Sequence, residues 1–334
     1  MRKINYKAVI QYVIVLGLGL GLIWYNSTRL PPQQLEYLKS AWSLARYEYL
    51  IPVLGALLLS HYSRALRWMM LMKPLGYTPS KINTYFAVLL GYFFNMLMPR
   101  LGEVMKCTVL AKYEKVAPDK LVGTILVERA VDMISMGIVA IIMVAIQFDR
   151  IGGFAFDAFA DMVRNKEGAT SYTKLFVILG ILLVLIIGLR YLFVKKADSK
   201  LVQNIKRIAR GVWEGFKSIR KVENLPLFIF HSVFIWSLYL FGIWIGFMAF
   251  PPVEHLGFPA ALSVLIFGSI GLIATPGGIG AYEFMVEKTL VRFDIPNVVG
   301  LAFGRLNWAA QTAITLVSGL FALIVMPIVN RNKE

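Results

Sequence analysis

Charged residues are scarce in this chain: they make up 16% of its 334 residues, against about a quarter in soluble globular proteins. Hydrophobic residues make up 58%, a composition that argues against a soluble enzyme. Cys107 is the only cysteine, which excludes a disulfide framework. The three histidines, His61, His231 and His255, stand far apart, so the sequence offers no Cys/His zinc site. We expect neither a cofactor nor a resident metal.

Long apolar runs take the place of the missing charges. A helix that crosses a bilayer needs about 20 mostly apolar residues, and the sequence therefore predicts an all-α, polytopic membrane protein with one integral membrane domain over residues 1–334. The first run follows a basic N-terminus and lacks a small-x-small cleavage site, so we expect an uncleaved span. The six predicted spans cover residues 8–25, 50–72, 121–148, 174–194, 225–250 and 298–327.

Two further apolar regions are interrupted by proline and glycine. Residues 82–98 run into PRLGE at 99–103, and residues 260–275 run into PGGIG at 276–280. Irregular backbone at membrane depth must be buried in protein or line a cavity, which favours two re-entrant hairpins; if both regions cross instead, the chain has eight spans. With re-entry, about two-thirds of the Lys and Arg lie on the cytoplasmic side, as the positive-inside rule requires, and both termini are cytoplasmic.

The two interrupted regions resemble each other. In each, a glycine precedes the proline by eight residues (Gly91 and Gly268), and farther along an arginine follows a Val-Gly pair by five or six residues (Arg129 and Arg305). Each half then consists of a span, an interrupted hairpin and a second span. If the span at 174–194 is the only one between the halves, their orientations are opposite, and they form an inverted repeat of the kind that places a transporter site at the repeat interface. The alternative is a chance similarity between two apolar segments. The halves comprise about residues 50–148 and 225–327.

A basic stretch, residues 195–224, joins the two halves. Six apolar residues recur in it at steps of three or four, from Leu201 to Ile219, which is the pattern of one helical stripe. Lysine and arginine populate the rest of the helix surface. We expect this helix to lie on the anionic inner leaflet, so the net charge of +16 does not indicate a nucleic-acid partner.

Ionisable residues inside the predicted spans are informative, because each costs about 2.5–3.5 kcal/mol on insertion scales. Glu103 can pair with Arg100 or Arg129, and Glu283 can pair with Arg305, so one acid–base pair recurs in both halves. A carboxylate beside an arginine can hold a charged headgroup. The alternative is an ion pair that only sets the register of two helices.

A second group of charges follows helical spacing. Glu128 and Asp132 stand four residues apart, on one face of a predicted span, and this face must point toward protein or water. Arg64, Arg67 and Arg100 lie near the inner ends of apolar runs. We expect these three to extend along the helix surface toward the inner headgroups.

The glycines at 277, 278 and 280 exclude a stable helix interior. They leave backbone amides free, and Ala281 starts the returning half-helix, whose N-terminus would suit a phosphate headgroup. The alternative is a loop that merely turns the chain. A Walker-type loop is excluded because no Gly-Lys-Ser/Thr follows. The candidate substrate-binding residues are Arg100, Glu103, Glu128, Arg129, Asp132, Pro276, Gly277, Gly278, Gly280, Glu283 and Arg305.

Three segments, RLGE at 100–103, VERAVD at 127–132 and PGGIGAYE at 276–283, resemble the lysylphosphatidylglycerol synthase transmembrane-region family. This is the flippase-like domain of the multiple peptide resistance factor, and the similarity covers nearly the whole chain. The resemblance implies a protein of a prokaryotic cytoplasmic membrane that moves a lipid, or a lipid-linked intermediate, between leaflets. It does not imply lipid aminoacylation, because the longest predicted cytoplasmic stretch is too short for a synthase domain.

The leading hypothesis is therefore a lipid translocator whose arginines, Arg129 and Arg305, hold a phosphate. A lipid-modifying transferase with Glu128 and Asp132 as acid and base is an alternative, although no nucleophile–base set is evident. A non-catalytic scaffold of an envelope-lipid pathway is the third. The expected partners are anionic membrane lipids, and either a second copy of the chain or a separate lipid-modifying enzyme.

Overall fold

The computed structural model describes residues 16–25, 28, 30–98, 100–148 and 222–331. The predicted span at 174–194 and nearly all of the basic linker lie outside these residues. The elements that carry the fold are helices, as the apolar runs predict. They are a short helix at Leu16–Tyr25, α2 (Pro32–Leu44), α3 (Leu50–Met72), α4 (Lys81–Leu97), α5 (Leu101–Glu114), α6 (Pro118–Ile146), α10 (Leu225–Met248), α11 (Phe258–Ala274), the 3-10 turn η4 (Pro276–Gly278), α12 (Ala281–Val291) and α13 (Asn297–Val329).

Proline and backbone conformation set the helix boundaries. Proline occupies the first turn of α6, α10 and α11, where its missing N–H has no intrahelical partner to lose. Between α4 and α5, Arg100 adopts a left-handed φ of 68°, and between α11 and α12, Gly277 adopts a φ of 61°. These breaks end each helix at the predicted interruption, so each apolar region folds as a hairpin.

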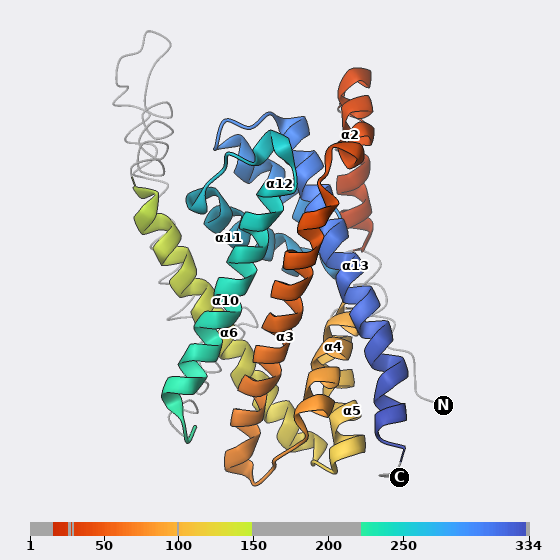
Figure 1. The fold of residues 1–334 in the computed structure, drawn as a ribbon, viewed down its shortest axis with the longest axis vertical. Coiled ribbons are helices and arrows are strands. Elements are labelled where there is room, and N and C mark those ends of the chain that lie inside the picture. Colours follow the sequence, from red (N-terminus) through yellow and green to blue (C-terminus); the bar gives the residue numbers. More distant parts are fainter. Residues whose placement is uncertain (1–15, 26–27, 29, 99, 149–221, 332–334) are drawn as a thin grey trace, which may run out of the picture.

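Two series of helices share one order: α3-α4-α5-α6 and α10-α11-α12-α13 each contain a long helix, a hairpin and a second long helix. The α4–α5 hairpin occupies the lower half of the molecule in Figure 1, and the α11–α12 hairpin the upper half. The two hairpins therefore lie in opposite halves of the molecule, as an inverted repeat predicts. Helix α3 packs against α10, α4 against α13, and α11 against α6, so the two series interlock.

Glycine lets the two helices of each hairpin approach closely. A Cβ atom added at Gly102 would lie 1.8 Å from the carbonyl oxygen of Gly91, and one added at Gly268 would lie 2.8 Å from the ring of Tyr282. Gly102 and Tyr282 are each the second residue of the returning helix. The spacing shared by Gly91 and Gly268 is thus a packing register that both hairpins use.

The tips of the two hairpins touch. A Cβ added at Gly277 would lie 3.6 Å from the carbonyl oxygen of Met96, near the end of α4. The short helix 16–25 crosses the same tip, because a Cβ added at Gly280 would lie 2.2 Å from the carbonyl oxygen of Gly19. Protein therefore covers the irregular backbone of η4, in the way that an apolar medium demands.

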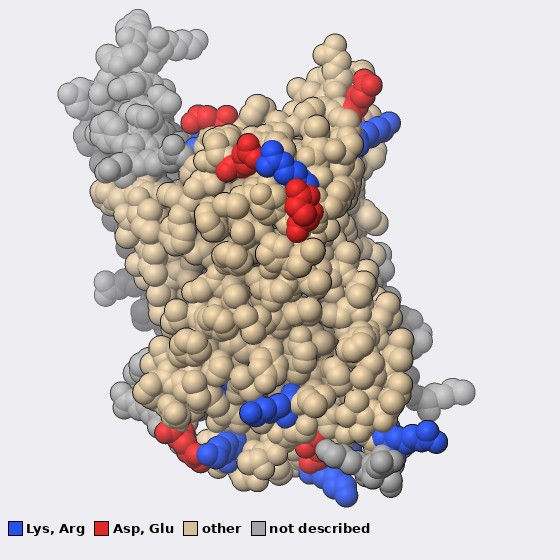
Figure 2. Space-filling view, viewed as in Figure 1, with Lys and Arg blue, Asp and Glu red and all other residues tan. Residues whose placement is uncertain are grey.

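The described helices form a membrane-embedded bundle. Helices α6, α10 and α13 are long and apolar enough to cross a bilayer. Figure 2 shows acidic and basic side chains at both ends of the molecule, with an uncharged band between them. The C-terminal ends of α3, α5 and α13 lie together at the lower end of the molecule in Figure 1. The charge pattern predicts that this end faces the cytoplasm. The number of spans and the side on which the termini lie stay predictions.

Gly102→Ala should destabilise the protein, because the new Cβ would overlap the backbone of α4 at Gly91. Overpacking of this kind costs about 1–3 kcal/mol, to be measured as a lower Tm in detergent. Gly123→Ala is the matched control, since nothing lies within 4 Å of its added Cβ and alanine is the better helix former. Equal Tm values for the two variants would contradict the close approach of α4 and α5.

Candidate functional site

Four buried charged side chains and one partly buried carboxylate meet between α3, α5 and α6. Arg64 and Arg67 lie one turn apart on α3, Glu128 and Asp132 lie one turn apart on α6, and Lys106 reaches in from α5. Spacings of three and four residues place each pair on a single helix face. We refer to these five residues as the buried charge cluster.

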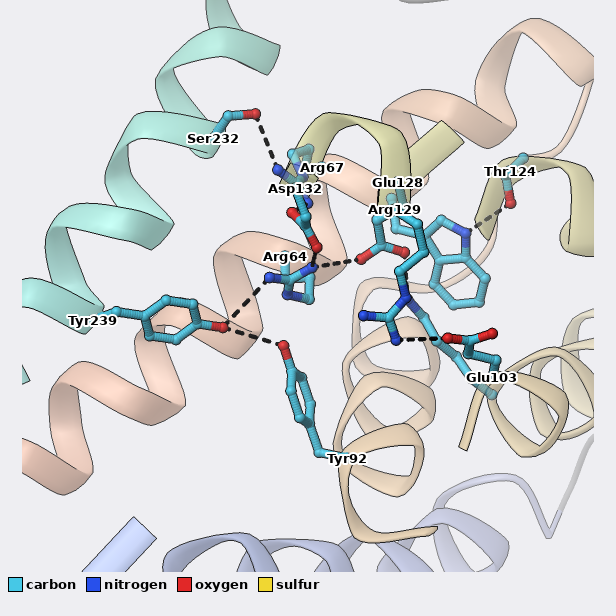
Figure 3. A network of polar contacts seen from close by, with 12 residues as sticks. Arg64, Arg67, Tyr92, Glu103, Thr124, Glu128, Arg129, Asp132, Ser232 and Tyr239 are labelled. Carbon is cyan, nitrogen blue, oxygen red and sulfur yellow. Dashed lines mark hydrogen bonds and ion pairs between the residues drawn. The ribbon is translucent and has the colours of Figure 1, made fainter. Parts of the chain in front are cut away.

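Each carboxylate of the cluster binds two cations (Figure 3). The Nη1 atom of Arg64 lies 3.1 Å from Oε1 of Glu128 and also bonds Asp132, while Nη2 of Arg67 lies 2.5 Å from Oδ1 of Asp132. The Nζ atom of Lys106 lies 2.7 Å from Oε2 of Glu128. Arg64 therefore bridges the two carboxylates, and the cluster ties α3, α5 and α6 together.

Helix α10 of the other half supplies neutral partners. Arg64 donates a hydrogen bond to the hydroxyl of Tyr239 (3.4 Å), which in turn bonds the hydroxyl of Tyr92 (3.1 Å). Arg67 donates to the hydroxyl of Ser232 (3.1 Å). These bonds cross the interface between the two halves (Figure 3), so a movement of α10 against α3 would change the surroundings of the buried arginines.

Lys106 is held by an aromatic ring as well as by a carboxylate. Its Nζ atom lies 3.9 Å from the centre of the Trp68 ring, within the range of a cation–π interaction. The indole N–H of Trp68 donates to the hydroxyl of Thr124 on α6 (2.8 Å). The position of the amine is thus set from two sides.

A more exposed pair, Glu103 and Arg129, borders the cluster. Oε1 of Glu103 lies 2.9 Å from Nη2 of Arg129, and their side chains are 34% and 52% exposed. Both residues line a cavity that Arg64, Asn95 and Lys106 also line. The cavity measures about 30 Å³, room for two or three water molecules, so a bound headgroup would require the hairpin to move.

The second half repeats the pair but not the cluster. Nε of Arg305 lies 3.1 Å from Oε2 of Glu283, and Glu283, like Glu103, is the third residue of its returning helix. Both predicted acid–base pairs are therefore confirmed, with Arg129 rather than Arg100 as the partner of Glu103. The positions that correspond to Lys106, Glu128 and Asp132, counted from the paired residues, hold Val286, Gly304 and Trp308.

The expectation that Arg64 and Arg67 extend to the headgroups is wrong. Arg64 is 7% exposed and Arg67 is fully buried, because carboxylates on the facing helix α6 neutralise them inside the protein. Sequence reasoning also missed Lys106. The sequence did contain a signal for the cluster. Arg64 and Arg67 are three residues apart and Glu128 and Asp132 are four apart, so each pair lies on one helix face and the two faces can meet.

The candidate residues of the second hairpin tip serve packing contacts in this conformation. Pro276 and Gly278 are buried, Gly280 lies against Gly19, and the carbonyl of Gly277 accepts a hydrogen bond from Trp308 (2.8 Å). None of the four lines the cavity described above. Arg100, the residue before α5, is exposed and likewise does not line that cavity.

The structure also reveals a contact between a hydroxyl and a histidine. Oγ of Ser63 lies 2.8 Å from Nδ1 of His231, and both residues are buried. His61 stacks on Tyr92 with ring centres 4.1 Å apart. Among the described residues, no group of three His, Cys, Asp or Glu side chains is placed to hold a metal ion.

Comparison with known proteins shows the family to which the chain belongs. The model of the lysylphosphatidylglycerol synthase transmembrane region matches residues 9–319. The chain belongs to this family. The UPF0104 membrane protein MJ1595 of Methanocaldococcus jannaschii is 22% identical over 272 residues, which cover 78% of this chain and 79% of that protein. No solved structure gives a significant match. The resemblance inferred from the three motifs is thereby confirmed.

Asp132→Asn should strongly destabilise the protein, because it leaves two buried arginines, Arg64 and Arg67, with one carboxylate fewer. Breaking a buried ion pair costs about 3–5 kcal/mol, to be measured by denaturant unfolding in detergent. Glu254→Gln is the matched control, because its partner Arg46 is 43% exposed and surface pairs contribute about 0–1 kcal/mol. A similar loss in both variants would show that burial does not set the strength of the cluster.

Proposed function

We propose that this protein moves a lipid between the two leaflets of a prokaryotic cytoplasmic membrane. The observation that carries the proposal is the meeting of two hairpins that lie in opposite halves of the molecule, each with a Glu–Arg pair at the same position of its returning helix. Inverted repeats with interrupted helices are typical of transporters that expose one site alternately to the two sides. Membership of the family supports a lipid-related role.

One end of the molecule is closed by an amide contact between the halves. Asn83, at the start of α4, and Asn330, which caps the end of α13, exchange two hydrogen bonds of 2.8 Å and 2.7 Å. Both residues are 1% exposed. The side chain of Asn83 also bonds Glu114 at the end of α5. We name the Asn83–Asn330 contact the lower latch, because it fastens the open end of the first hairpin to the last helix of the second half.

The other end has a matching contact. Gln147, which caps the end of α6, donates from its amide to the hydroxyl of Ser263 (3.0 Å) and to the carbonyl of Pro259 (3.0 Å) in α11. We name the Gln147–Ser263 contact the upper latch. In each latch, an amide residue at the end of one half's last helix binds the first turns of the hairpin in the other half. The two latches are thus related by the repeat.

Both latches are formed in this conformation, and the cavity beside the buried charge cluster is small. In the proposed cycle, one latch opens at a time, so that the hairpin it fastens tilts away and admits a headgroup from one leaflet. The hydrogen bonds of an open latch can be replaced by water at the membrane surface, which keeps the energetic difference between the conformations small.

A lipid-modifying activity is less well supported by the geometry. Glu128 and Asp132 would be its acid and base, but each carboxylate already bonds two cations. The contact between Ser63 and His231 is buried and uses Nδ1 of the imidazole. We therefore propose a transporter and not an enzyme. Its proposed partners are membrane lipids, and either a second copy of the chain or a separate lipid-modifying enzyme.

Arg129→Gln and Arg305→Gln should each slow lipid movement about tenfold or more, because each removes a charged hydrogen-bonding group. The assay uses vesicles with fluorescent phosphatidylglycerol, in which dithionite quenches only the outer leaflet unless the protein moves lipid. Arg46→Gln, which breaks an exposed pair, is the matched control and should keep the wild-type rate. Wild-type rates in both site variants, with lipid movement in the control, would remove the two pairs from the mechanism.

Cross-linking either latch should stop lipid movement reversibly. Cysteines replace Asn83 and Asn330, or Gln147 and Ser263, in a Cys107→Ser background, and a short thiol-to-thiol reagent with a reducible link joins them. Each cross-link should hold one end closed, and reduction should restore movement. The corresponding single-cysteine variants are the controls. Continued movement with either latch cross-linked would contradict alternating opening of the two ends.

A further inference from the structure

The buried charge cluster contains one positive charge in excess. Its three cations face two carboxylates, and the pair that borders the cluster, Glu103 and Arg129, is neutral as a whole. Every ion-pair partner of Arg64, Arg67 and Lys106 within the described chain belongs to this count. A buried cation without a full counter-charge is costly in protein and costly in a bilayer, so the excess charge calls for an anion that is not part of these helices.

Two hydrogen-bond donors of the cluster are also unused. The Nε atoms of Arg64 and Arg67 are buried and find no acceptor among the described residues. Arg64 lines the small cavity together with Lys106, and Asn95 and Arg129 line its other walls. Buried polar groups are nearly always satisfied in folded proteins. Of the two arginines, only Arg64 lines the cavity. Its unsatisfied donor, next to a cavity with surplus positive charge, indicates a ligand with acceptor oxygens.

We propose that this cavity binds a singly charged phosphate group, with Arg64, Lys106 and Arg129 as its ligands. Arginine and lysine donate strong, charge-assisted hydrogen bonds to phosphate oxygens. The side chain of Arg129 is the most exposed of the three, so it can turn away from Glu103 toward the incoming phosphate group. The phosphate is either the phosphodiester of a lipid headgroup or free inorganic phosphate. In the first case the site deepens the proposed function, on which that assignment rests.

The described residues of the proposed site all come from the first half. In the second half, Val286, Gly304 and Trp308 occupy the positions of Lys106, Glu128 and Asp132, and Arg305 pairs with Glu283. Among the described residues, we therefore assign the phosphate site to the surroundings of the first hairpin, whose tip contacts the second hairpin.

Lys106→Met provides the test, because it removes the excess charge and leaves Arg64 to neutralise Glu128. The full chain in detergent is titrated with short-chain phosphatidylglycerol, short-chain phosphatidylcholine and inorganic phosphate, by calorimetry. We expect phosphatidylglycerol to bind the wild type at least about tenfold more tightly than Lys106→Met, and Lys106→Arg to recover most of this affinity. Lys288→Met is the matched control, because it removes an exposed lysine that pairs with Glu287.

The titrations distinguish a lipid headgroup from free phosphate as the ligand. Binding of phosphatidylglycerol without inorganic phosphate supports a lipid headgroup, and binding of both supports a phosphate site that takes free anions. Binding of phosphatidylcholine that is also lost in Lys106→Met supports recognition of the phosphodiester itself. Equal affinities of every probe for wild type and Lys106→Met, or no binding of any probe, would overturn the proposal. A binding site without lipid movement in vesicles would refute the transport function only, and lipid movement unaffected by Lys106→Met would refute the phosphate site only.

Discussion

Neutralisation of charge inside an apolar medium is the constraint on which this structure depends. Lipid offers a buried arginine neither a counter-ion nor a hydrogen-bond acceptor, so the protein must supply both. Asp132 and Glu128 do so from α6, and they hold α3, α5 and α6 in one arrangement because Arg64 bonds both carboxylates. The same constraint explains why the interrupted backbone of η4 lies beneath α4, α13 and the short helix 16–25. Polar groups at membrane depth are found where protein surrounds them.

The two halves of the inverted repeat share their architecture and differ in the charged residues that they carry. Both halves keep the features that build a hairpin: a close approach of two helices, a Glu–Arg pair and an amide cap at the end of the last helix. At the corresponding positions, the first half has a lysine and two carboxylates around its pair, where the second half has Val286, Gly304 and Trp308. The two halves thus share a frame, and the proposed phosphate site depends on the charges that the first half adds to it.

Several elements could be predicted from the sequence because their causes are local. Apolar runs identify the long helices, and the residues around Pro276 mark a break that the backbone confirms at Gly277. The pairing of Glu283 with Arg305 followed from a spacing that recurs in both halves. Arg64 and Arg67 were misinterpreted for a physical reason: a hydropathy pattern cannot distinguish an arginine that extends to the headgroups from one that a facing helix neutralises.

By itself, the sequence determined that this chain is a helical membrane protein with a repeated, interrupted hairpin, because helix formation and membrane insertion depend on the composition of each segment. Only the tertiary structure decided which charges meet. Lys106, Arg64 and Glu128 come from three helices that are separated along the chain, and their contact requires α5 and α6 to fold back onto α3. The two latches depend in the same way on contacts between distant halves, Asn83 with Asn330 and Gln147 with Ser263. Such contacts are properties of packing, since side chains far apart in sequence meet only when the helices that carry them have found their places.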